Sequence, residues 1–347
     1  MVEEDSVRDA LELIEECYER GWTDGLPVVP PTASGLERMI HAAGRDPHEA
    51  LGVLAPKDGI LTVEKVALNA LMAGCKPEYM PVVIAAAEAI VDPKFNLRFN
   101  SRSTRGPAPL LVINGPIRQR LEINCRSNVF GPGWRANATI GRAVRLLIRN
   151  VGGALPGEMD RATLGHPGKY TYCIGEDEEH SPWEPLHVER GFAKEDSVVT
   201  VISCEGPNQF GVAKGTADMI LEALVEALRS IMRFSSNYRG IGDVTIVFDT
   251  DQRNELVKAG YSKADVRRHI FANTWRTAGE ARRFSSPLTE DSGAEIPDHQ
   301  PMHLFTSEKT IYIIAAGAGN RFGAFMPTWR SIPGVAEPVS RRIRDSE

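Results

Sequence analysis

Apolar residues recur three and four positions apart over several stretches of the chain, which is the spacing of an amphipathic helix. The helices predicted in this way cover residues 6–20, 34–44, 62–74 and 77–91, with two more that end near Asn150 and begin at Thr216. Other stretches are short, continuously apolar and rich in β-branched residues, which is typical of buried strands. These strands are predicted at 110–114, 198–204, 244–248 and 311–316.

Strands that alternate with helices of this length predict an α/β fold, in which helices flank a layered sheet of mixed or parallel strands. The length of 347 residues predicts two lobes, which we place at 1–195 and 196–347. No internal repeat is evident in the sequence. Residues 284–303 have the composition of a loop and are expected to form a linker or an active-site lid.

Composition and charge narrow the classes of function. The formal net charge of −6 argues against a nucleic-acid partner, because such proteins are usually basic. The first residues lack the pattern of a secretory signal, and no apolar run approaches the roughly 18 residues of a membrane span. Five widely spaced cysteines form no CxxC pair. We therefore expect a cytoplasmic protein without a membrane partner.

The charges are unevenly distributed along the chain. Between Arg98 and Arg161 there are eleven arginines and no lysine, against three acids, so the local balance is 11 − 3 = +8. The planar guanidinium binds carboxylates and phosphates in a bidentate manner, which favours a small anionic partner. Salt bridges within the chain, or a subunit interface in a homo-oligomer, would use the same arginines. The acidic run at 176–179 could neutralise part of the block.

A glycine-rich turn in the centre of this block leads into a predicted helix. Such a turn presents free backbone N–H groups and the positive end of the helix dipole, which together suit an anion. The residues predicted to bind the substrate here are Gly131, Gly133, Asn137, Thr139 and Arg142. A second glycine-rich loop, with Gly319 and Asn320, follows the last predicted strand and could also bind an anion. Neither loop matches a nucleotide motif, so the sequence identifies no cofactor.

The densest group of reactive side chains lies at 165–187. If a strand runs from Lys169 to Ile174, Lys169 and Cys173 share one face, and the lysine would lower the pKa of the thiol. Glu178 could then transfer protons as a general acid or base. The residues predicted to be catalytic are Cys173, Lys169, Glu178 and His166.

Two other interpretations of this segment stay open. It could be a solvated acidic loop with no chemistry. It could also bind a metal, since His166, Cys173, His180 and His187 are all competent ligands, although their spacing matches no chelate motif. Outside the segment, Cys75 precedes a predicted helix start and Lys76, both of which would lower its pKa. The alternative is an inert packing role, which is common for a cysteine at a helix junction.

Several stretches together resemble a bacterial family related to the UGSC (seleno)proteins. They are GWTDGLPVVPPT at 21–32, AGCKPEY at 73–79, NGP at 114–116, ANATIGR at 136–142 and HPGKY at 166–170. The resemblance spans about residues 20–335 and implies a bacterial cytoplasmic protein. The signature cysteine or selenocysteine motif of the UGSC proteins is absent here, which argues against a selenoprotein-type redox role.

These observations predict an enzyme, either a lyase or a hydrolase, that acts on a small metabolite bearing a carboxylate or a phosphate. Acid–base or cysteine chemistry would carry the reaction. Two alternatives are a thiol-dependent redox protein, which would form a reversible disulfide, and a non-catalytic anion-binding or scaffold protein. The substrate, the reaction type and the oligomeric state are left open by the sequence.

Overall fold

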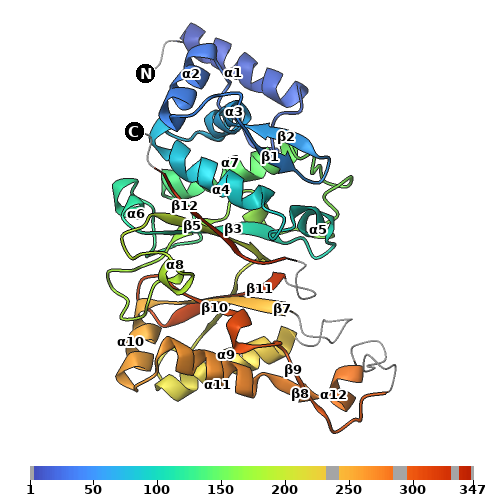
Figure 1. Ribbon diagram of the computed structural model, residues 1–347, viewed down its shortest axis with the longest axis vertical. Coiled ribbons are helices and arrows are strands. Elements are labelled where there is room, and N and C mark those ends of the chain that lie inside the picture. Colours follow the sequence, from blue (N-terminus) through green and yellow to red (C-terminus); the bar gives the residue numbers. More distant parts are fainter. Residues whose placement is uncertain (1–3, 232–241, 284–294, 330–335, 345–347) are drawn as a thin grey trace.

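The protein stacks four layers in the order helices, strands, strands, helices (Figure 1). The structure is a computed structural model, and it describes residues 4–231, 242–283, 295–329 and 336–344. The prediction of an α/β fold with a mixed sheet flanked by helices is confirmed.

The helical layer above the sheet in Figure 1 comes from the first half of the chain. It consists of α1 (Glu4–Glu19), α2 (Ala33–Ala43), α3 (Val63–Ala73), the 3-10 turn η1 (Pro77–Tyr79), α4 (Met80–Val91) and α7 (Arg135–Asn150). Thr32 and Thr62 cap α2 and α3, because each hydroxyl accepts a hydrogen bond from the third backbone amide of its helix. Both helices end at a glycine in the left-handed conformation, Gly44 and Gly74.

One eight-stranded sheet runs through both halves of the chain. Its strands are β3 (Ala108–Asn114), β4 (Cys173–Gly175), β5 (Val198–Cys204), β6 (Asn208–Gly211), β7 (Gly242–Phe248), β10 (Ile311–Ala315), β11 (Phe322–Trp329) and β12 (Val339–Arg342). The order is β10-β7-β11-β5-β3-β4, with β12 beside β5 and β6 beside β11. This one hydrogen-bonded path forms both strand layers, which join where β11 meets β5. Strands from both sides of the expected lobe boundary share this sheet. The shared sheet does not confirm a division into two lobes, which stays a prediction.

The sheet repeats one arrangement that is not evident in the sequence. β3 pairs in parallel with β4 and antiparallel with β5, while β7 pairs in parallel with β10 and antiparallel with β11. β5 and β11 then meet at Cys204 and Thr328. β6 follows β5 in the chain but pairs with β11, and β12 follows β11 but pairs with β5.

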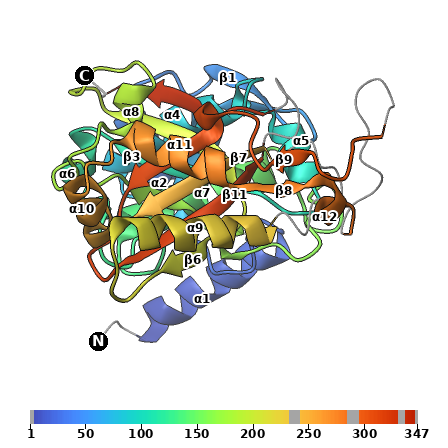
Figure 2. The ribbon, with the colours of Figure 1, turned by 90° about the horizontal axis from the view of Figure 1, so that it is seen from below.

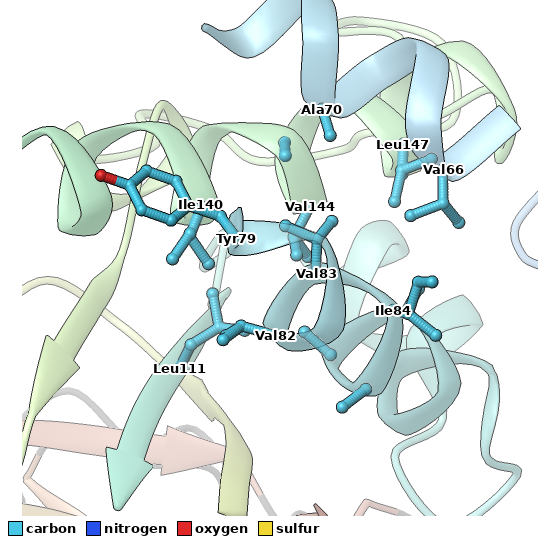
Figure 3. Close-up of a cluster of buried hydrophobic side chains, with 14 of the residues drawn as sticks. Val66, Ala70, Tyr79, Val82, Val83, Ile84, Leu111, Ile140, Val144 and Leu147 are labelled. Atoms are coloured by element: carbon cyan, nitrogen blue, oxygen red, sulfur yellow. The ribbon is translucent and has the colours of Figure 1, made fainter. Parts of the chain in front are cut away.

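The core is divided by the sheet, because successive side chains of a strand point to opposite faces. On β3, Leu111 and Ile113 pack against the helices, while Leu110 and Val112 face the space between the two strand layers. Figure 3 shows the helical side of this core, where Leu111 lies next to Val82 of α4, and Val83 of α4 lies beside Val144 of α7. The space between the strand layers collects apolar side chains from β3, β4, β5, β7, β10 and β11.

The lower helical layer covers the other strands. It contains α9 (Ala217–Ile231), α10 (Thr250–Lys258) and α11 (Lys263–Asn273), and α9 and α11 lie side by side beneath β7 (Figure 2). The smaller elements are the hairpin β1 (Ala50–Leu54) and β2 (Gly59–Thr62), the short helices α5 (Leu97–Arg102), α6 (Ile117–Arg120) and α8 (Leu186–Glu189), and the 3-10 turns η2 (Pro167–Lys169) and η4 (Glu308–Thr310).

A projecting unit completes the fold on one side of the lower layer. It is formed by β8 (Trp275–Thr277), α12 (Ala278–Arg282) and β9 (Pro301–His303). The expected loop over 284–303 is therefore wrong at its end, where β9 pairs with β8. Residues 284–294 of that loop lie outside the described part of the chain.

Candidate functional site

Many arginines of the basic block meet carboxylates of the same chain. Those with a carboxylate oxygen within 4.0 Å include Arg98, Arg105, Arg118, Arg126, Arg142 and Arg145. The acidic run supplies part of this neutralisation, because Arg118 contacts Glu178 and Glu179, while Arg126 contacts Asp177. Much of the positive charge thus serves the fold.

Arg142, predicted to hold the substrate, has an internal partner instead. Its Nε and Nη2 donate to the two carboxylate oxygens of Asp24 at 2.9 and 2.7 Å, and Nη2 also donates to the Leu26 carbonyl. Burial raises the pKa of Asp24, but the hydrogen bonds from Arg142 outweigh it and hold this pKa below its ordinary value. The anion that Arg142 binds in this structure is a side chain of its own chain.

Asn137 and Thr139, the two polar residues expected to complete the anion cradle, are also engaged within the protein. The Asn137 amide accepts from the Asn124 N–H at 2.8 Å and donates to the carbonyls of Asn124 and Cys173. The Thr139 hydroxyl donates to the Arg135 carbonyl one turn back in α7. Both side chains join backbone segments rather than face a cavity.

The expected strand from Lys169 to Ile174 is wrong in its first part. Residues 167–169 form the 3-10 turn η2, and β4 begins only at Cys173. Cys173 is buried in the core, and burial together with the nearby Cys75 raises the pKa of its thiol, the opposite of the expected effect of Lys169. Cys75 itself has a pKa raised by burial to about 12. A thiol in this state is a poor nucleophile.

The four residues predicted to be catalytic do not form one group. His166 and Lys169 precede β4, whereas Glu178 follows it. The Glu178 carboxylate accepts from the Asn114 side chain at 3.0 Å and from the Gly115 N–H at 2.8 Å, at the carboxyl end of β3.

Lys169 and His166 lie instead in a charged cluster with Asp160 and Arg145. Lys169 Nζ donates to Asp160 Oδ1 at 2.6 Å, and Arg145 Nη2 lies 3.7 Å from the other carboxylate oxygen. Burial lowers the pKa of Lys169. Burial, with repulsion from Lys169 and Arg145, lowers the pKa of His166 to about 4. His166 is therefore neutral at pH 7, and its Nδ1 accepts from the Gly168 N–H at 3.2 Å, which leaves the proton on Nε2.

Both predicted glycine-rich loops reach one pocket of about 840 Å³. We call it the inter-sheet pocket, and its lining includes residues 126–131, 207–209, Val247, Asp249, 316–318, Asn320 and 322–324. It lies at the carboxyl ends of the parallel strands β7 and β10, where α/β sheets commonly bind ligands. Gly131 and Asn320 line it, whereas Gly133, Asn137, Thr139 and Arg142 do not.

Gly319 adjoins the pocket without lining it. A Cβ at this position would lie 2.7 Å from the Asp251 carboxylate carbon, so a larger residue here would require the Asp251 side chain to move. The backbone amides of Ala318, Gly319 and Asn320 have no hydrogen-bond acceptor within the described part of the chain. They are therefore available to a ligand.

Two charged side chains of the pocket were not singled out by the sequence. Arg126 supplies a half-exposed guanidinium. Asp249 is buried, and burial raises its pKa, with repulsion from Asp251 added, although the amides of Gln252, Arg321 and Phe322 donate to it. The sequence did contain a signal for Asp249. It directly follows a predicted strand, and with Gln252 it forms the pattern of a capping box at a helix start.

The predicted metal ligands are not brought together. Within the described residues, the donor atoms close enough to share an ion belong to Asp177, Glu179 and His180. Arg253 donates to Asp177 at 2.9 Å, and Arg118 donates to both oxygens of Glu179, so these carboxylates are already neutralised. Cys173 lies in the core, and His187 is fully buried with its Nε2 beside the Lys194 carbonyl.

Comparison with protein families finds no family model that matches the chain, and a search of curated proteins finds no match. The resemblance to UGSC-related proteins stays a prediction. None of the described helices has the length and hydrophobicity needed to cross a membrane.

Proposed function

We propose that the protein is an enzyme that acts on a small carboxylate- or phosphate-bearing metabolite, as a lyase or hydrolase, in the inter-sheet pocket. The observation that carries this proposal is the meeting of both predicted glycine-rich loops, one arginine and one buried carboxyl around a single pocket of about 840 Å³. This volume suits a small metabolite.

The charges of the pocket suit a division of roles. Arg126 would bind the anionic group of the substrate, because Asp177 lies 3.9 Å from its Nη1 and already accepts from Arg253. The same Nη1 also forms a hydrogen bond of 2.7 Å with His180 Nδ1. His180 Nδ1 also lies 2.8 Å from Asp177. Since one ring nitrogen either carries a proton or accepts one, it can donate to Asp177 or accept from Arg126, but not both. The free amides of Ala318 to Asn320 would stabilise negative charge that develops on the substrate.

Asp249 is the group we propose for proton transfer. A raised pKa brings a carboxyl closer to the pH at which it can both give and take a proton. Cysteine chemistry is not favoured, because all five cysteines are buried. The same burial removes support from the alternative of a thiol-dependent redox protein.

The proposal is tested by screening small carboxylates and phosphate esters for turnover, followed by two substitutions. Asp249→Asn can cap α10 through its one carbonyl oxygen, but it loses the acceptor for the Arg321 and Phe322 amides, so its unfolding free energy is measured beside its activity. With the fold retained, it is expected to lower kcat about 100-fold or more with little change in KM. Arg126→Ala is expected to raise KM about tenfold. Glu226→Gln, on the exposed face of α9, serves as the matched control. Full turnover by Asp249→Asn would refute the assigned chemistry, and binding without turnover of any compound would favour the non-catalytic alternative.

A second candidate centre is the Asp160–Lys169–His166 cluster, which retains two of the residues predicted from the sequence. The lowered pKa of Lys169 supports it, since an amine that loses its proton more readily can act as a base, and the neutral His166 lies in the same cluster. Lys169→Met separates the two candidates. Loss of kcat in this variant with unchanged unfolding free energy would assign the chemistry to the cluster rather than to Asp249.

A further inference from the structure

A second pocket, of about 440 Å³, lies where α2, the end of α3 and the start of α7 meet. We call it the basic pocket. Its lining consists of Val29, Gly35, Arg38, Met39, Leu71, 74–78 and Arg135. It shares no lining residue with the inter-sheet pocket, although the segment from Gly131 to Arg135 connects the two.

Three of its lining side chains are cations, Arg38, Lys76 and Arg135, against the single acid Glu78. None of the three cations forms an ion pair with any described residue. This distinguishes them from Arg142 and Arg118 on the neighbouring elements, whose guanidinium groups are matched by carboxylates. A pocket with uncompensated positive charge lowers the free energy of a bound anion.

Arg135 is held in a position that leaves its terminal nitrogens available. Its Nε donates to the Gly74 carbonyl at 3.0 Å, and neither Nη has a hydrogen bond to a described residue. Anchoring by one bond reduces the side-chain entropy that a ligand would otherwise have to overcome.

The start of α7 adds to the same electrostatic field. Arg135 is its first residue, and Trp134 provides no side-chain cap. The N–H groups of residues 135–137 have no acceptor within the described part of the chain. Such a helix start carries a partial positive charge.

Part of the wall of the basic pocket is apolar. Val29, Met39 and Leu71 contribute hydrocarbon, and Pro77 begins the 3-10 turn η1. Lys76, Pro77 and Glu78 also line an adjoining pocket of about 560 Å³, whose other side is formed by Tyr79, Pro81 and residues 120–122. A ligand could therefore place its anionic group among the cations and the rest of its structure in the adjoining space.

We propose that the basic pocket is an anion site of its own, which takes the phosphate group of a small phosphorylated molecule. A phosphate offers three acceptor oxygens and close to two negative charges, which suits three cations around one pocket better than a single carboxylate does. This site does not depend on the reaction proposed for the inter-sheet pocket.

The test is isothermal titration calorimetry of the whole chain with inorganic pyrophosphate at low ionic strength. Wild type is expected to bind at one saturable site, and Arg38→Ala and Arg135→Ala are each expected to weaken binding at least fivefold. Arg135→Lys, which keeps the charge and loses the bond to Gly74, is expected to lie between wild type and Arg135→Ala. Arg268→Ala, which removes an exposed arginine of α11, is the matched control and should bind as wild type does.

Three outcomes would overturn the proposal. The first is the absence of saturable binding, or equal affinity of wild type and a folded Arg38→Ala variant. The second is tighter binding of succinate than of pyrophosphate, which would exclude the phosphate class. The third is loss of pyrophosphate binding in Arg126→Ala but not in Arg135→Ala, which would move the phosphate to the inter-sheet pocket. Loss of turnover in Asp249→Asn bears only on the proposed reaction, so the two proposals can fail separately.

Discussion

At the residue scale, Arg142 and Asp24 form an ion pair that joins α7 to the segment before α2. Arg142 fits an anion cradle by its place in a glycine-rich turn and helix. Its partner Asp24 lies 118 positions earlier in the chain, and no local pattern connects them. Asp249, in contrast, stands directly after a predicted strand, where a ligand-facing acid could have been expected.

The pair between Arg142 and Asp24 is expected to be structural. Both side chains are largely buried, 15% and 11% exposed, so Arg142→Met leaves an uncompensated carboxylate. We expect this variant to lose about 2–4 kcal/mol of unfolding free energy, measured by urea denaturation at pH 7. The double variant with Asp24→Asn should lose less than the sum of the single changes.

The control for this pair is Arg20→Met, which breaks an exposed pair with Glu16 on α1 and should cost less than about 1 kcal/mol. If Arg142→Met instead left stability unchanged and raised KM for an identified substrate, Arg142 would have the binding role that the sequence predicts.

His166 should make the stability of the protein depend on pH below neutrality. Its pKa is about 4 in the folded protein and about 6.5 in an unfolded chain, so the unfolded state binds more protons between these values. Stability from this source is complete above pH 6.5 and is lost as the pH falls toward 4. The loss is on the order of 2–3 kcal/mol.

Other groups titrate over the same range, so the measurement compares wild type with His166→Asn by urea denaturation at pH 7 and pH 4.5. Asparagine can still accept from the Gly168 N–H at the start of η2. We expect the variant to lose less stability than wild type on acidification. Parallel losses in the two proteins would contradict the low pKa of His166.

At the element scale, long periodic helices and apolar strands are predictable, and short or unusually composed elements are not. The predicted strand over 198–204 coincides with β5, and the predicted helix over 62–74 with α3. β11 was missed because Pro327 lies inside it, and proline is unusual in a central strand. Before Pro327, β11 pairs with β6, and directly after it Thr328 pairs with Cys204 of β5. The Pro327 carbonyl still accepts a hydrogen bond from the Glu205 N–H.

The close contact of α7 with the residues before β4 gives a prediction for Gly141. In an exposed helix, glycine to alanine usually stabilises by up to about 1 kcal/mol. Here a Cβ would lie 2.7 Å from the Tyr172 backbone nitrogen and would collide with the Thr171 hydroxyl. We expect Gly141→Ala to lose about 2 kcal/mol or more in urea denaturation. A gain in stability would show that α7 can move away from this segment without cost.

At the scale of the whole molecule, the repeat of strand order could not be read from the sequence. The repeat lies in the pairing, because β6 and β12 each leave their own half and pair with the other. Trp183 is likewise separated from its core, since it precedes β5 but packs against Phe248 with the lower helices. Pairings and contacts of this kind join residues far apart in the chain, where amphipathic spacing carries no information.

These exchanged elements predict that the two halves unfold together. Asp177 and Arg253 form an ion pair across the halves in which both side chains are fully buried, and the Asp177 N–H donates to the Ala315 carbonyl. We expect one cooperative transition in which calorimetric and van't Hoff enthalpies agree. Arg253→Met should leave Asp177 buried without its partner and cost about 3–5 kcal/mol, and a single transition should remain at a lower midpoint. Two separate unfolding transitions, of which Arg253→Met shifts only the one at higher temperature, would contradict this prediction. They would support the two independent lobes that the chain length predicts, because the exchanged strands would then contribute too little to couple the two halves.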